Sequence, residues 1–195
     1  MTSFDPGTTQ PSPSAVPGGQ SRPDSPTVAV VATTPETAVA DMGRAMDLAG
    51  ISQFLSPEIK TFLKVNISWQ HWYPACSTTP WQIEGVTKAL EALGHKDLVA
   101  AHNGTVVVNS YEGELKNKHK AAQLKVGLSD IHLDSEPNGW IDYKPKAEML
   151  VLDDIFPEGI QIPESFPGTN IVHLPTMKTH VFTTMTGAMK NAFGG

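Results

Sequence analysis

The chain has 195 residues, enough for one domain with its own hydrophobic core, and 20 acidic against 14 basic residues give it a formal charge of −6. A chain this acidic is not expected to bind nucleic acid by neutralising phosphates, and the absence of a run of about 20 apolar residues predicts no membrane span. The single cysteine, Cys76, cannot form an internal disulfide or a four-cysteine cluster. We therefore expect this chain to carry no cofactor of its own and to bind neither nucleic acid nor membrane.

The N-terminal segment has the composition of a tail. It begins Met1-Thr-Ser-Phe-Asp-Pro, without the basic and apolar regions of a secretion signal, so a cytoplasmic location is expected. Residues 1–26 hold six prolines and three glycines among many Ser and Thr. Such a segment cannot bury enough apolar area to offset the entropy of ordering. We predict a disordered tail over 1–26 and one α/β domain over 27–195.

Strand and helix patterns alternate after the tail. The β-branched run 28–32 predicts a buried strand, and a helix is predicted over 35–50, between a proline and a glycine. Residues 61–67 predict a second strand. A second helix is predicted over 80–94, because it opens with proline, carries one apolar stripe and closes with glycine.

The rest of the chain continues this alternation. Further strands are predicted at 98–101, 105–108, 147–152, 159–162 and 170–174. Residues 112–126 predict a weaker, lysine-rich helix, and 184–193 predict a loop leading into a short helix. The pattern predicts an α/β fold with a mostly parallel sheet and helices on both faces.

Acidic residues are absent from two stretches, residues 59–83 and 171–195. The lysines in these stretches are Lys60, Lys64, Lys178 and Lys190. If the stretches meet in space, they form a positive pocket on an acidic protein, which favours an anionic ligand. If they lie apart, a docking surface or a scaffold without catalytic function is the better interpretation.

The first stretch places polar groups where a predicted strand ends. Lys64 and Asn66 leave the same face of that strand near its carboxyl end, the edge at which open α/β sheets bind ligands. Ser77, Thr78 and Thr79 precede the next predicted helix. Capping that helix is the expected role for one of these hydroxyls, and the alternative is that they bind a phosphate or carboxylate together with free helix N–H groups.

Two other groups have the residue types of chemical sites. Cys76 is either a nucleophile activated by its surroundings or an inert small residue, and the second interpretation is favoured. Asp130, His132 and Asp134 alternate along the chain and offer three ligand atoms, but a solvated loop explains them equally well. No metal site is predicted.

The second stretch supplies the predicted catalytic residues. Lys178 and His180 share a face if this segment is extended, and the lysine would lower the pKa of the imidazole toward that of a neutral base. The segment from Thr186 to Asn191 has the composition of a phosphate loop without the order of a Walker motif. The predicted ligand-binding residues are Lys64, Asn66, Ser77, Thr78, Thr79, Thr186, Gly187, Lys190 and Asn191.

Four blocks of the sequence resemble a known family. These blocks are Leu63-Lys-Val-Asn66, Ser77-Thr-Thr-Pro80, His173-Leu-Pro-Thr-Met-Lys-Thr-His180 and Thr186-Gly-Ala-Met-Lys-Asn-Ala-Phe-Gly-Gly195. They resemble the hallmark blocks of domain of unknown function 362, over about residues 28–195. The resemblance implies a cytoplasmic, Rossmann-like α/β domain of unestablished activity. Some relatives carry an added ferredoxin-like module with 4Fe-4S clusters, and family members usually continue past the last block. We therefore expect a C-terminally truncated member with an incomplete fold.

The leading functional hypothesis is an enzyme-like domain that binds a small anionic substrate or cofactor. In it, the lysines neutralise the anion, Asn66 and Asn191 orient it, and His180 transfers a proton. The alternative is an accessory or docking domain for a redox partner that carries iron–sulfur clusters. Whether the chain is an enzyme stays open at this point. The separation of Lys64 and Lys178 discriminates the two hypotheses, because convergence in one cleft favours a ligand site.

Overall fold

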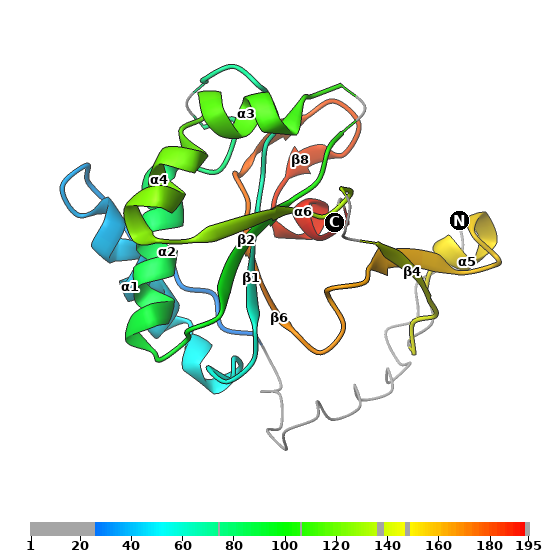
Figure 1. Ribbon diagram of the computed structural model, residues 1–195, viewed down its shortest axis with the longest axis horizontal. Helices are drawn as coiled ribbons and strands as arrows, with labels where there is room; N and C mark the ends of the chain where they lie inside the picture. The colour runs from blue at the N-terminus through cyan, green and yellow to red at the C-terminus, as the bar shows by residue number, and fades with distance from the viewer. Residues whose placement is uncertain (1–25, 74, 106, 136–138, 147–148, 194–195) are drawn as a thin grey trace, which may run out of the picture.

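The computed structural model describes residues 26–73, 75–105, 107–135, 139–146 and 149–193 (Figure 1). Apart from Pro26, the predicted tail over 1–26 lies outside the described residues. No helix among the described residues is long and apolar enough to cross a membrane.

A parallel sheet of four strands forms the centre of the fold. Its strands are β1 (Thr61–Val65), β2 (Leu98–His102), β3 (Ser129–His132) and β6 (Asn170–Leu174), in the spatial order β3-β2-β1-β6. From β1, the chain adds β2 and then β3 on one side of the sheet. Strand β6 then pairs with the opposite side of β1. The strand order therefore reverses between β1 and β6. Such a reversal is the switch point at which Rossmann-like folds bind ligands, outside the carboxyl ends of the strands.

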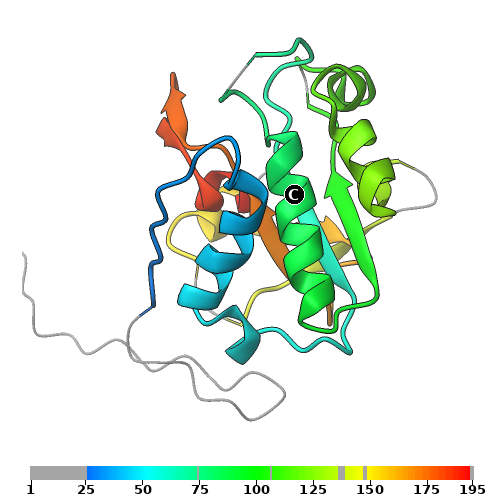
Figure 2. The same ribbon diagram turned by 90° about the vertical axis from the view of Figure 1, so that its left-hand side faces the viewer.

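Most of the helical cover lies on one face of the sheet. Three of them, α1 (Ala38–Leu48), α2 (Pro80–Ala92) and α4 (His119–Val126), form a layer on one face (Figures 1 and 2). That layer encloses the larger core cluster, which includes Leu63, Ile83 and Leu90. On the other face, Phe62 packs against Phe166. The α/β, Rossmann-like, mostly parallel architecture expected from the sequence is confirmed.

The remaining elements surround the carboxyl ends of the strands or lie beside the sheet. Helix α3 (Ser110–Lys116) follows β2, and α6 (Ala188–Phe193) contacts β1 and β6. Two small antiparallel sheets pair β4 (Trp140–Tyr143) with β5 (Ile160–Pro163) and, in a hairpin, β7 (Lys178–His180) with β8 (Thr184–Thr186). Short turns of helix are η1 (Ile51–Gln53) and α5 (Leu152–Ile155).

Three predicted strands are wrong. Residues 28–32 have no regular structure and both Val28 and Val30 are exposed. The described residues of 105–108 form a loop, and those of 147–152 form a bend that leads into α5. Each run has local strand propensity but pairs with no strand in the described parts of the chain, and strand formation depends on cross-strand packing more than on intrinsic preference.

The predicted helix over 112–126 is two helices. Lys118 adopts a left-handed backbone, with φ of 65°, between α3 and α4. A non-glycine residue in that region interrupts a right-handed helix. The break separates a short helix over the sheet edge from one that packs against α2.

Gly85 sets the spacing between α1 and α2. A Cβ atom at this position would lie 2.5 Å from the carbonyl oxygen of Val39 and 2.7 Å from Cγ of Met42. Gly85→Ala should therefore destabilise the fold by about 2 kcal/mol, because overpacking outweighs the gain of about 1 kcal/mol in helix propensity. Urea unfolding measures this change.

Gly43→Ala is the matched control in α1. A Cβ there would meet only Cβ of Ala89, at 3.4 Å. This variant should be as stable as the wild type or more stable, because the propensity gain meets little steric cost. Equal stability of the two variants would contradict the proposed close approach at Gly85.

Candidate functional site

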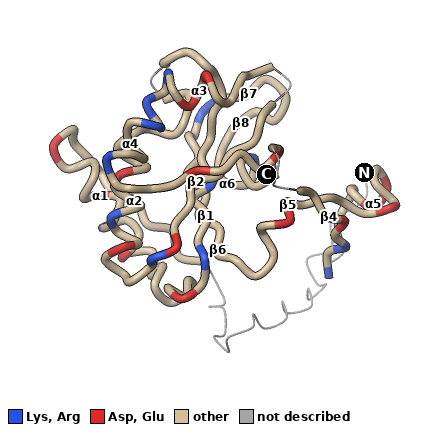
Figure 3. The backbone as a smooth tube through the Cα atoms, in the orientation of Figure 1, with Lys and Arg blue, Asp and Glu red and all other residues tan. Residues whose placement is uncertain are grey.

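The two acid-free stretches meet in one cavity of about 480 Å³. It lies at the switch point, among the carboxyl ends of β1 and β2, the β7–β8 hairpin and α6. Its lining includes seven of the predicted site residues, namely Lys64, Asn66, Lys178, His180, Thr186, Lys190 and Asn191. No Asp or Glu occurs among the described lining residues, whereas acidic and basic residues are interspersed along the helical layer (Figure 3).

Lys64 provides the buried charge of this cavity. Its side chain extends from β1 on the face opposite α2, and only 4% of the residue is exposed. Among the described residues, no Asp or Glu forms an ion pair with it. Burial lowers the pKa of Lys64 to about 8, because the low-dielectric interior disfavours the charged form.

Asn66 and Lys178 join the two sides of the cavity. The Lys178 ammonium donates to Oδ1 of Asn66 at 3.0 Å, across 112 positions of sequence. Asn66 is held in turn by Thr78, whose hydroxyl accepts from the Asn66 N–H at 2.8 Å and whose own N–H donates to the Asn66 carbonyl. Burial lowers the pKa of Lys178, and the positive charge of Lys190 lowers it further.

The C-terminal block adds a hydroxyl and an amide. Thr186 lies opposite Lys178 in the β7–β8 hairpin, and its buried hydroxyl has no hydrogen-bond partner among the described residues. Asn191 donates to the carbonyl oxygen of Lys64 at 2.9 Å, and its amide nitrogen lies 3.3 Å from Nδ1 of His173. A buried hydroxyl without a partner costs free energy, which a ligand oxygen in the cavity would recover.

His180 has a structural contact at one ring nitrogen. Its Nδ1 accepts hydrogen bonds from the backbone N–H groups of Phe182 and Thr183, at 3.2 and 3.3 Å. Because Nδ1 accepts these two bonds, the ring proton lies on Nε2. In that tautomer Nε2 is the ring atom that can donate a hydrogen bond, and proton acceptance at Nδ1 requires release of the hairpin contact.

Ser77, Thr78, Thr79 and Gly187 are outside the residues that line the cavity. Ser77 accepts from the Ser68 N–H at 3.1 Å, and the Thr78 hydroxyl donates to the carbonyl of Leu174. Thr79 caps α2 by accepting from the Gln82 N–H, the role expected for one of the three hydroxyls. These residues position the cavity walls, and their direct contact with a ligand stays a prediction.

A family model described as domain of unknown function (DUF362) matches residues 61–195. The chain belongs to this family. The chain has no significant match among curated proteins or among solved structures. The match begins at the first residue of β1 and contains every residue of the cavity.

A second cavity, of about 670 Å³, lies outside the DUF362 match. Its lining is Pro26, Thr27, Ala29, Ala45, Met46, Ala49, Ile51 and Phe54. None of these side chains is charged. The cavity therefore lacks the groups that recognise an anion.

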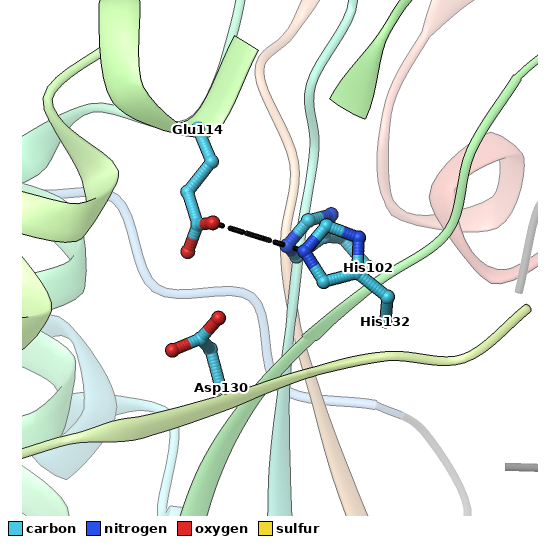
Figure 4. A group of neighbouring side chains, drawn as sticks. All are labelled: His102, Glu114, Asp130 and His132. Atoms are coloured by element: carbon cyan, nitrogen blue, oxygen red, sulfur yellow. Dashed lines mark ion pairs between the residues drawn. The ribbon is translucent and has the colours of Figure 1, made fainter. Parts of the chain in front are cut away.

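Inside the DUF362 region, a separate polar cluster lies at the carboxyl ends of β2 and β3. It consists of His102, Glu114, Asp130 and His132, here called the His/carboxylate cluster (Figure 4). His102 also lines the 480 Å³ cavity. Burial, followed by the neighbouring His132, lowers the pKa of His102 to about 3, so its ring is neutral.

Of the three potential metal ligands named from the sequence, the structure keeps two together and separates the third. Asp130 and His132 belong to the cluster, whereas Asp134 accepts from the Gly104 N–H at 3.0 Å. His102 and Glu114 were not recognised. The register gives the missing signal, because His102 pairs with His132 on the neighbouring parallel strand.

Proposed function

We propose that this DUF362 domain binds a small anionic ligand at the switch point of its sheet and is enzyme-like. The observation that carries the proposal is the convergence of Lys64 and Lys178 on one cavity whose described lining has no acidic residue. The volume of about 480 Å³ is within the range of small-molecule sites. Phosphate and carboxylate groups fit the donors present.

The described donors suggest a role for each group. Lys64, Lys178 and Lys190 neutralise the anion, and Asn66 and Asn191 orient it. Thr186 supplies a hydroxyl donor that has no described protein partner. His180 lies at the border of the cavity as a hydrogen-bond donor or, once released from the hairpin, as a proton-transfer group.

Two features favour a ligand site over docking of a redox partner. A docking surface needs accessible charges, whereas Lys64 is buried. Its pKa of about 8 also allows proton exchange near neutral pH, which is useful in catalysis and unnecessary for docking.

Calorimetric titration with sulfate, inorganic phosphate, pyrophosphate and oxalate tests the proposal. We expect saturable binding of at least one anion, with one site per chain, and a rise in melting temperature that follows ligand concentration. Choline chloride at the same ionic strength controls for general salt effects. If none of the four anions binds more strongly than this control, the proposal of an anion site is wrong.

Sulfate affinity should fall as the pH rises through about 8. The reason is that Lys64 is charged below its pKa and neutral above it. Sulfate keeps its charge over this pH range, so any change in affinity comes from titration of groups on the protein. The other titratable groups at the cavity are Cys76, His102, Lys178, His180 and Lys190, with His173 beside Asn191, and burial keeps the pKa values of His102 and His173 below their usual range. Lys64→Met should flatten the profile between pH 7 and 9, and an unchanged profile would assign the titration to another group.

A further inference from the structure

We propose that the His/carboxylate cluster binds one divalent first-row transition-metal ion. Its four potential ligand atoms come from β2, α3 and β3, and all lie within 4.8 Å of one another. The two histidines are register partners, so their rings leave the sheet on the same side, and Glu114 approaches them from α3 (Figure 4).

Glu114 and the two histidines are spaced as ligands around one ion and not as hydrogen-bonded groups. Oε2 of Glu114 lies 3.8 Å from Nε2 of His132 and 4.0 Å from Nε2 of His102. Both distances are too long for hydrogen bonds. Ligands bound at about 2.0 to 2.2 Å around one metal ion lie roughly 3 to 4 Å apart, so small side-chain movements complete the site.

His102 provides a second, independent indication. It is 2% exposed, and neither of its ring nitrogens has a hydrogen-bond partner among the described residues. A buried polar group without a partner is rare in native proteins and needs an explanation. A metal ion between Nε2 of His102 and the Glu114 carboxylate supplies a partner for one of these two nitrogens.

Groups around the cluster hold its members in place. Lys120 forms an ion pair with Oδ1 of Asp130. The Tyr111 ring stacks on His132 with the ring centroids 3.6 Å apart, and Ser110 Oγ lies 3.5 Å from Nδ1 of the same histidine. Outer contacts of this kind fix the orientation of metal-binding histidines.

The donor set selects the class of ion. Two imidazole nitrogens and two carboxylate oxygens suit Zn²⁺, Fe²⁺ or Co²⁺, whereas Mg²⁺ and Ca²⁺ prefer oxygen ligands alone. Zinc and cobalt therefore serve as probes, and magnesium serves as the negative control. The metal proposal does not depend on anion binding, so either can fail while the other holds.

Titration of the metal-free full chain with Co²⁺ tests the site. We expect one equivalent to bind with the visible absorption of a four- or five-coordinate ion, and Zn²⁺ to displace it while Mg²⁺ in excess does not. Glu114→Gln should weaken Zn²⁺ binding at least tenfold. Glu112→Gln is the matched control on the same helix, because Glu112 is half-buried and pairs with Lys116 outside the cluster. It should bind Zn²⁺ as the wild type does.

A measurement on the wild type covers the case in which Glu114→Gln fails to fold. In nitrogen-15 NMR spectra, the Nε2 resonances of His102 and His132 should shift upon addition of one equivalent of Zn²⁺, while that of exposed His71 should not. No saturable Co²⁺ spectrum in the wild type, no shift of these two resonances, or full Zn²⁺ affinity in folded Glu114→Gln would each overturn the proposal.

Discussion

Lys64→Met should weaken sulfate binding about 10- to 150-fold and at the same time stabilise the fold. The loss of affinity follows from removing a charge-assisted hydrogen bond worth about 1.5 to 3 kcal/mol. The gain in stability follows from replacing a buried ammonium, for which no acidic partner occurs among the described residues, with an apolar side chain of similar length. A simple packing defect would lower both quantities.

The size of the stability gain depends on pH. The Lys64 pKa is 10.5 when unperturbed and about 8 in the folded chain, so the unfolded chain binds more protons between these values. The charged lysine therefore costs the wild-type fold on the order of 3 kcal/mol below pH 8, a penalty that disappears as the pH rises toward 10.5. Lys64→Met should show its full stabilisation at pH 7 and little at pH 10.5 in urea unfolding.

Lys60→Met is the control for this experiment. Lys60 precedes the same strand at its amino end, is partly exposed, and lies 3.9 Å from Asp97. Such surface pairs contribute little, so neither sulfate affinity nor stability should change by more than small amounts. If Lys64→Met behaves like Lys60→Met, Lys64 does not contact the anion.

Thr78→Val should destabilise the fold by about 2 to 4 kcal/mol and also weaken sulfate binding. The buried Thr78 hydroxyl bridges the two strands at the switch point, since it accepts from the Asn66 N–H and donates to the Leu174 carbonyl. Valine keeps the shape but leaves both backbone groups buried without this partner. Asn66 then loses the contact that fixes it beside Lys178.

Thr87→Val is the matched control, because Thr87 and Thr78 are both 1% exposed. The Thr87 hydroxyl donates only to the Ile83 carbonyl, within its own helix. Its replacement should change the free energy of unfolding by no more than about 1 kcal/mol. Urea unfolding of both variants and calorimetry with sulfate separate the two roles. Equal effects of the two substitutions would show that Thr78 does not hold the switch point together.

The sequence by itself determined the strands and helices whose local signals agree with their packing. The run at β1 and the proline-to-glycine helix at α2 were predicted almost to their ends, because apolar patterning, capping and termination all coincide there. The charge distribution also indicated the cavity lined by Lys64, Lys178 and Lys190, since the two stretches without acidic residues can be read from the sequence alone.

Tertiary structure decided what local signals leave open. The runs at 28–32 and 105–108 have the composition of strands but find no partner, so pairing rather than propensity settled their conformation. The register between β2 and β3 brought His102 beside His132. The interruption of the helix at Lys118 ended α3 and left Glu114 above these two histidines. These residues are distant in sequence, and only strand pairing and helix placement determine which of their side chains share one site.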